Sequence, residues 1–253
     1  MTFATYPSLA GRVVFVSGGA TGIGAAIVRA FAGSGSKVAF VDVDAKAGTA
    51  LASELASSGG DVLFLESDVT DIAALRQSIG TTRTRLGPVA VLVNNAANDH
   101  RHDFATIDAD YWDKSLNVNV RHHFFAAQAV HPHMKGLGHG AIINLGSIAW
   151  RRGGGEYPAY ATAKAGILGL THALARAFGK DNIRVNSIEP GAVMTERQRQ
   201  LWFKTQASVD TVIQRQLLKH TLLPQDIART ALFLAADDSS MITCQSLIVD
   251  GGR

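Results

Sequence analysis

The chain has 253 residues, of which 47% are hydrophobic and 18% charged, a balance that suits one large globular domain and excludes a disordered protein. Its net charge of +3 comes without a basic block, so we expect neither nucleic acid nor a membrane as a partner. The single cysteine, Cys244, excludes an intrachain disulfide, and no signal pattern or membrane-length apolar run is present. We therefore expect a cytoplasmic protein.

Seven short runs rich in β-branched residues predict buried strands, and helix-like segments fall between most of them. The strand runs cover residues 13–16, 38–43, 62–65, 89–93, 141–145, 183–188 and 247–249. The helical segments cover residues 23–32, 46–57, 72–85, 111–134, 159–178 and 225–235. Apolar strands that alternate with helices imply a parallel sheet covered on both faces. The sequence predicts a single α/β domain over 1–253, a doubly wound parallel sheet of the Rossmann type with about seven strands.

Two stretches show neither pattern. Residues 151–158 are rich in glycine, and residues 195–221 are polar with scattered apolar side chains. We expect both to be irregular. We also expect the second stretch to form a mobile lid over a ligand site, because closing segments of this kind sequester reactions from water.

A glycine-rich turn follows the first predicted strand and opens the first helix. Its spacing is Gly-x-x-x-Gly-x-Gly, which differs from the common Gly-x-Gly-x-x-Gly fingerprint. Glycines there permit a tight turn, backbone approach to a pyrophosphate and close helix packing, and the helix N-terminus favours the anion. A glycine turn without a ligand is the alternative. The residues that we expect to bind a dinucleotide in this turn are Gly18, Thr21, Gly22, Ile23 and Gly24.

Polar side chains also follow the second, third and fourth predicted strands. Asp42 ends the second strand, where a carboxylate can accept hydrogen bonds from the adenosine ribose and repel a 2′-phosphate. No arginine follows closely to bind that phosphate, so Asp42 favours NAD over NADP; a solvated turn aspartate is the alternative. Asp68 and Val69, then Asn95 and Ala96, stand at the sheet edge where α/β proteins bind ligands.

Tyr160 and Lys164 have the spacing of one helix face, where residues four apart nearly touch. Free tyrosine has a pKa of about 10, and a nearby ammonium group lowers it. The phenol can then act as a general acid or base near neutral pH. An ordinary half-exposed helix explains the same spacing if nothing else supports the motif.

Taken together, these residues resemble the classical short-chain dehydrogenase/reductase family over essentially the whole chain. The matching pieces, in order, are Gly18-x-x-x-Gly22-x-Gly24, Asp68-Val69, Asn94-Asn95-Ala96, Asn119, Ser147, Tyr160-x-x-x-Lys164, Pro190-Gly191 with Thr195, and Asp250-Gly251-Gly252. Ser17, Ala97 and Cys244 depart from the usual threonine, glycine and glycine of that family. None of the three departures touches the expected catalytic groups.

The resemblance implies a catalytic tetrad of Asn119, Ser147, Tyr160 and Lys164. Tyr160 would take the substrate hydroxyl proton as hydride leaves the carbon, and Ser147 would hold that oxygen. Lys164 would lower the pKa of Tyr160 and bind the nicotinamide ribose. Asn119, which its sequence context favours over Asn117, would hold a water that connects Lys164 to solvent. The further cofactor contacts that the resemblance implies are Tyr160, Lys164, Pro190, Gly191, Val193 and Thr195.

A closer resemblance is to bacterial NAD-dependent D-xylose dehydrogenases and neighbouring sugar dehydrogenases. It rests on residues 6–9, 94–102, 111–113, 117–122 and 147–150. A pyranose requires hydrogen-bonding groups and flat apolar faces. A charged surface loop or a subunit contact is the alternative for residues 98–102. The residues expected to bind substrate are Asn98, Asp99, Arg101, Ser147, Trp150, Tyr160 and Trp202.

Nine histidines raise the question of a metal, but His122 and His123 are adjacent and cannot share a helix face, and no ligand spacing is present. We expect no metal. The sequence predicts an NAD-dependent aldose 1-dehydrogenase that oxidises the anomeric hydroxyl of a pentose or deoxyhexose, such as D-xylose or L-arabinose, to a lactone. The alternatives are an NAD(P)-dependent dehydrogenase of a sugar acid, steroid or 3-hydroxyacyl alcohol, and a non-catalytic dinucleotide-binding protein. The resemblance also implies a homotetramer.

Overall fold

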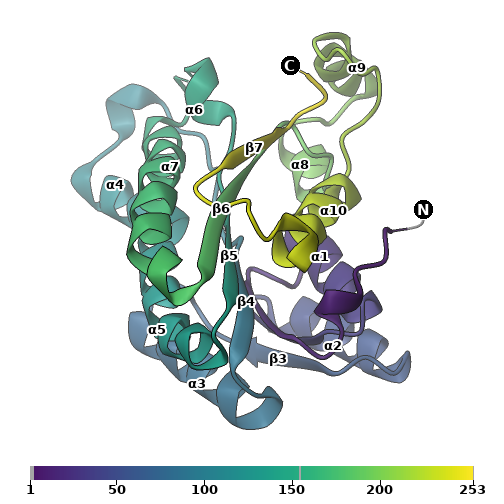
Figure 1. Ribbon diagram of the computed structural model, residues 1–253. Coiled ribbons are helices and arrows are strands. Elements are labelled where there is room, and N and C mark those ends of the chain that lie inside the picture. The colour runs from purple at the N-terminus through teal and green to yellow at the C-terminus, as the bar shows by residue number, and fades with distance from the viewer. Residues whose placement is uncertain (1–2, 154, 253) are drawn as a thin grey trace.

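Seven parallel strands form the centre of the computed structural model, which describes residues 3–153 and 155–252 (Figure 1). They are β1 (Val13–Ser17), β2 (Lys37–Asp42), β3 (Val62–Glu66), β4 (Val89–Asn94), β5 (Gly140–Leu145), β6 (Ile183–Pro190) and β7 (Ser246–Val249). Their order in the sheet is β3-β2-β1-β4-β5-β6-β7, and every neighbouring pair is parallel. The predicted doubly wound sheet in a single domain is confirmed.

Helices cover both faces of the sheet because both faces of its strands are apolar. On β1, Val14 and Val16 belong to one core cluster, while Val13 and Phe15 belong to the other. Helices α1 (Gly22–Gly33), α2 (Ala45–Ser57) and α10 (Pro224–Ala235) contribute to the first cluster. Helices α3 (Ile72–Leu86), α5 (His122–Leu137) and α7 (Pro158–Phe178) contribute to the second, on the other side of the sheet in Figure 1.

The strand order reverses at the centre of the sheet. β1 pairs with β2 on one side and with β4 on the other, so the chain reaches the outer strand β3 and then crosses back to β4. Connections diverge at the carboxyl ends of β1 and β4, and this divergence opens the crevice where α/β sheets bind ligands.

One predicted helix is interrupted in the structure. In place of a single helix over 111–134 there is α4 (Ala109–Leu116), a π-helical turn at Asn117–Arg121, and then α5. A π-turn inserts an extra residue into the helical ladder and is frequent at functional sites. This one carries Asn119, a fully buried side chain.

The stretch over 195–221 is not irregular, contrary to the prediction. It contains α8 (Glu196–Leu201) and α9 (Gln206–Gln214). Threonines start both helices: the Thr195 hydroxyl accepts from the Gln198 N–H at 3.2 Å, and the Thr205 hydroxyl accepts from the Ser208 N–H at 3.2 Å. Within the predicted irregular stretch 151–158, α6 (Ala149–Arg152) ends, and α7 begins at Pro158; Gly154 lies outside the described residues.

Short 3-10 turns at Pro7–Leu9, Phe104–Thr106, Gly179–Asp181 and Asp237–Ser239 complete the regular elements of the described chain. None of the helices in the described ranges is long and apolar enough to cross a membrane.

Candidate active site

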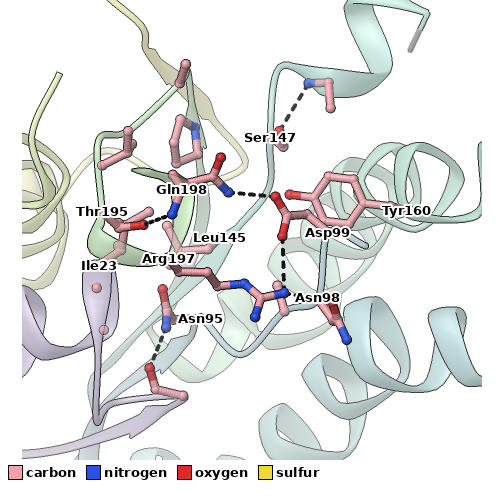
Figure 2. Close-up of a pocket in the computed structure, with 18 of the residues that line it drawn as sticks. Ile23, Asn95, Asn98, Asp99, Leu145, Ser147, Tyr160, Thr195, Arg197 and Gln198 are labelled. Atoms are coloured by element: carbon pink, nitrogen blue, oxygen red, sulfur yellow. Dashed lines mark hydrogen bonds and ion pairs between the residues drawn. The ribbon is translucent and has the colours of Figure 1, made fainter. Parts of the chain in front are cut away.

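A cavity of about 1110 Å³ opens at the carboxyl ends of the strands (Figure 2). Most of the predicted site residues line it, although they come from six strand ends and from α1, α7 and the segment before α8. They are Gly18, Thr21, Gly22, Ile23, Gly24, Asp42, Asp68, Val69, Asn95, Ala96, Asn98, Asp99, Arg101, Ser147, Tyr160, Lys164, Pro190, Gly191, Val193 and Thr195. Three predicted residues are not in the lining: Asn119, Trp150 and Trp202.

The glycine turn after β1 is packed too tightly for larger residues. Gly18 has a φ of +66°, and a Cβ on it would lie 2.7 Å from the Ala96 Cα. A Cβ on Gly24 would lie 1.8 Å from the Gly18 carbonyl oxygen. The start of α1 therefore rests directly on the turn, with its first backbone N–H groups at the cavity wall. A helix N-terminus placed in this way favours a phosphate.

Ser17 and Asn95 fix this turn to the neighbouring strand. The Ser17 hydroxyl accepts hydrogen bonds from the backbone N–H groups of Asn95 at 3.0 Å and Ala96 at 3.2 Å. The Asn95 amide donates to the carbonyl oxygen of Gly18 at 2.7 Å. Serine thus supplies the hydroxyl that the usual threonine would supply at this position.

Asp42 stands at the end of β2 with its carboxylate oriented by two backbone groups. It accepts from the N–H of Ala20 at 2.9 Å and from the N–H of Asp44 at 3.1 Å. An ionised carboxylate has about four acceptor positions, so two remain for a ligand in the cavity.

Lys164 is fully buried on α7, and its ammonium group donates to the Leu145 carbonyl oxygen at 2.8 Å. Its nitrogen lies 5.6 Å from the centre of the Tyr160 ring. Burial lowers the pKa of Lys164 to about 7, and the Asp99 carboxylate opposes this change. The lysine therefore titrates near neutral pH, unlike an exposed lysine.

The pKa of Tyr160 is raised in this structure, whereas the sequence predicts that Lys164 lowers it. Burial of the phenol is the main cause, and the nearby Asp99 carboxylate adds to it. A hydrogen bond with the Ser147 side chain acts in the opposite direction. Desolvation and the Asp99 charge together disfavour the phenolate more strongly than the hydrogen bond with Ser147 favours it.

Asn119 supports the site from outside the cavity. Its side-chain oxygen accepts from the Asn98 N–H at 2.8 Å, and its amide donates to the Asn98 carbonyl oxygen at 3.0 Å. These two bonds hold Asn98, which is the first residue of a polar loop at residues 98–101 that follows β4. A water relay from Lys164 through Asn119 stays a prediction.

The two predicted tryptophans lie elsewhere. The Trp150 indole donates to the buried Glu189 carboxylate at 3.0 Å, which holds it against the end of β6. The Trp202 ring is stacked under Arg101, whose guanidinium carbon is 4.0 Å from the ring centre. Neither ring lines the cavity, and the stacking of either ring on a substrate stays a prediction.

The polar loop at residues 98–101 is joined to α8 across the cavity, which the sequence does not reveal. The Gln198 amide donates to the Asp99 carboxylate at 2.6 Å, and Arg197 forms an ion pair with the same carboxylate at 3.6 Å (Figure 2). The sequence does carry a signal for the start of α8 itself, because Thr195 followed by Gln198 has the Thr-x-x-Gln spacing that starts helices. The cavity residues that sequence reasoning missed include Arg152, Tyr157, Arg197, Gln198 and Phe203.

His122 and His123 are fully buried beneath the site. The His122 ring nitrogen lies 3.4 Å from the Ser17 hydroxyl, and a His123 nitrogen lies 3.3 Å from the Asn144 side-chain oxygen. Burial lowers the pKa of His122 to about 3 and that of His123 well below its usual value, so both are neutral. Across residues 3–153 and 155–252, no group of three or more His, Cys, Asp and Glu side chains could hold a metal ion.

Curated relatives match the chain over nearly its full length. A probable galactose dehydrogenase from Rhizobium meliloti is 48% identical over 98% of this chain and 96% of its own. A D-xylose 1-dehydrogenase from Caulobacter vibrioides is 42% identical over 100% of this chain and 99% of its own.

Solved structures share the fold. A short-chain dehydrogenase/reductase from Serratia marcescens has a TM-score of 0.89 at 35% identity, covering 97% of this chain and 98% of that one. A blue fluorescent protein from a metagenomic library, in complex with NADPH, has a TM-score of 0.88 at 36% identity over the same shares.

A family model described as enoyl-(acyl carrier protein) reductase matches residues 18–253. That span contains the glycine turn, the Ser147 and Tyr160 pair, and Lys164. With these relatives, the chain belongs to the short-chain dehydrogenase/reductase family of oxidoreductases.

Proposed function

We propose that this protein is an NAD-dependent aldose dehydrogenase that oxidises the anomeric C1 hydroxyl of a sugar to a lactone. The observation that carries the proposal is the arrangement of Tyr160, Ser147 and the Asp99 carboxylate in the cavity that also contains the glycine turn. A base beside a polar loop suits an alcohol that carries further hydroxyl groups.

Each catalytic side chain has a role that its surroundings support. Tyr160 accepts the proton of the C1 hydroxyl as hydride leaves C1, and Ser147 donates a hydrogen bond to the same oxygen. Bound NAD supplies the hydride acceptor and a positive charge on its nicotinamide ring. A positive charge near Tyr160 favours the phenolate and so offsets the effect of burial on its pKa. Lys164, titrating near neutral pH, can pass the proton onward.

The cofactor preference rests on Asp42. Its carboxylate lines the cavity with two acceptor positions open, which suits ribose hydroxyls and repels a 2′-phosphate. A related structure at 36% identity is in complex with NADPH, so the fold alone does not determine the cofactor. We therefore expect a higher kcat/KM with NAD than with NADP.

Replacing Asp42 by alanine tests this preference. The change removes both the ribose hydrogen bonds and the repulsion of the 2′-phosphate, so the ratio of kcat/KM values for NAD and NADP should fall by about tenfold or more. Steady-state kinetics with both cofactors measure it. A wild-type enzyme that prefers NADP would contradict the assignment of Asp42.

The substrate proposal rests on the polar lining of the cavity near Tyr160. Asn98, Asp99 and Arg101 present acceptors and donors there, and a buried polar group left unpaired costs about 1–3 kcal/mol. A steroid or acyl chain cannot pair with such groups, whereas a sugar can. Relatives named as a probable galactose dehydrogenase and a D-xylose 1-dehydrogenase support the same class. D-galactose, D-xylose and L-arabinose are the first candidates.

We also propose a homotetramer. Exposed apolar side chains gather around the edge strand β7: Ile248 on the strand is 48% exposed, and Leu217, whose backbone N–H donates to the Gly252 carbonyl oxygen, is 81% exposed. A free sheet edge with apolar neighbours is suited to a subunit contact. Light scattering after gel filtration should give four times the chain mass of 26.8 kDa.

A substrate panel tests the function. Purified protein is incubated with NAD or NADP and a set of aldoses, and reduced cofactor is measured by absorbance. The panel includes a sugar acid, a 7-hydroxysteroid and a 3-hydroxyacyl thioester. We expect an aldose with NAD to give the highest kcat/KM. Oxidation of the steroid or the thioester without any aldose would reject the proposal.

A further inference from the structure

The polar loop after β4 and helix α8 meet through two side chains of the helix. Gln198 donates to one oxygen of Asp99 at 2.6 Å, and Arg197 lies 3.6 Å from the other. Arg197 also donates to the Asn98 side-chain oxygen at 3.3 Å. The two segments are about 100 residues apart in sequence, so the contact depends on how the fold places α8 beside the loop.

These contacts orient the carboxylate toward the reacting position. Asp99 is close enough to Tyr160 and Lys164 to raise the pKa of both. Figure 2 shows its side chain between α8 and the Tyr160 phenol. An ionised carboxylate has about four acceptor positions, and the contacts with Gln198 and Arg197 occupy two of them. The remaining positions are available to a ligand beside the Tyr160 phenol.

We propose that Gln198 and Arg197 are positioning residues that hold Asp99 as the acceptor for the substrate hydroxyl next to the reacting carbon, which is the C2 hydroxyl of an aldose. This inference rests on the proposed function. Tyr160 and Ser147 bind the oxygen on C1, so a carboxylate beside the phenol meets the neighbouring hydroxyl. A hydrogen bond to a charged acceptor is stronger than one between neutral groups.

The position of the helix therefore becomes part of substrate recognition. The Asp99 side chain is only 27% exposed. A partly buried carboxylate requires hydrogen-bond donors, and the donors on α8 keep the Asp99 carboxylate in a single orientation. When α8 is in place, the acceptor is set before the sugar binds, and less ordering is required on binding.

The test compares D-galactose and D-xylose with their 2-deoxy derivatives at saturating NAD. The variants are Gln198→Leu, the similarly sized Gln198→Glu, and Asp99→Asn. The matched control is Gln206→Leu, since Gln206 also donates to an aspartate, Asp210 at 2.8 Å, but lies outside the cavity on α9. The readout is the ratio of kcat/KM for the sugar to kcat/KM for its 2-deoxy derivative.

We expect a ratio of about tenfold or more in the wild type and in Gln206→Leu. In Asp99→Asn and in both Gln198 variants the ratio should fall several-fold, with a higher KM for the sugar and the KM for NAD within about twofold. Lower stability alone would leave the ratio unchanged. An active wild type combined with unaltered ratios in the Gln198 variants would overturn the inference alone. A wild type that oxidises no aldose of the substrate panel would overturn the proposed function itself.

Discussion

At the scale of single residues, the proposed chemistry depends on the proton of Tyr160. With phenylalanine in its place, the ring still fills its position but cannot accept a proton. We expect Tyr160→Phe to lower kcat by about a hundred- to ten-thousandfold, because general acid–base groups contribute in that range. Binding of NAD, followed by fluorescence titration, should change by less than about threefold. Turnover near the wild-type level would disprove the assignment of the base.

The Asp99 carboxylate gives a second prediction, on pH dependence. A negative charge near the phenol disfavours the phenolate, so Asp99 raises the pKa of Tyr160. Oxidation needs the ionised phenol, and its rate should rise with pH. Asp99→Asn removes the negative charge, so the rising limb of kcat should move to lower pH. The measurement is kcat against pH for both proteins with saturating sugar; a shift toward higher pH would refute the electrostatic account.

Sequence patterns are sufficient for the residues whose roles depend on local spacing. Tyr160 and Lys164 share one helix face, and Gly18 and Gly24 share one turn, so each pair is visible in the linear sequence. The placement of Trp150 is not visible, because it depends on Glu189, which lies 39 residues away on β6. The contact between Gln198 and Asp99 is hidden for the same reason.

At the scale of elements, the turn before β7 contains a residue in an unfavourable backbone conformation. Cys244 has a φ of +64°, a region that L-residues avoid and glycine adopts freely. This geometry explains why the family usually has glycine at this position. Cys244→Gly should stabilise the fold by about 1 kcal/mol and raise Tm by roughly 2–4 °C.

Calorimetry of the wild type, Cys244→Gly and Cys244→Ala measures the predicted rise in Tm. Cys244→Ala is the control, since it removes the thiol but retains the Cβ and its strain. We expect the alanine variant to unfold at or below the wild-type temperature and the glycine variant above it. A glycine variant that unfolds below the alanine variant would show that the backbone strain is negligible.

The strands and long helices follow from sequence periodicity, whereas α8 and α9 do not. β1 and β4 are continuous apolar runs because both faces are buried, which makes them easy to recognise. Helix α8 buries none of its six residues fully, so it has no apolar stripe to predict it. Its position depends on contacts with the loop after β4, and those contacts are tertiary.

At the scale of the whole molecule, the reversal of strand order brings distant parts of the chain to one cavity. The end of β1 provides the glycine turn, the end of β2 provides Asp42, and the ends of β4 and β5 lead to Asp99 and Ser147. The alternation of strands and helices predicts this edge of the sheet as the ligand site. It does not predict the substrate, which depends on loops and short helices.

The most direct test of the account follows a labelled hydrogen. The protein is incubated with NAD and D-galactose or D-xylose that carries deuterium at C1, and NMR locates the label in the products. We predict that deuterium appears at C4 of the nicotinamide ring, that the sugar becomes a lactone, and that Tyr160→Phe forms neither product at a comparable rate. Reduced cofactor without deuterium, or no reduction by any aldose while a hydroxysteroid or 3-hydroxyacyl substrate reacts, would contradict the account.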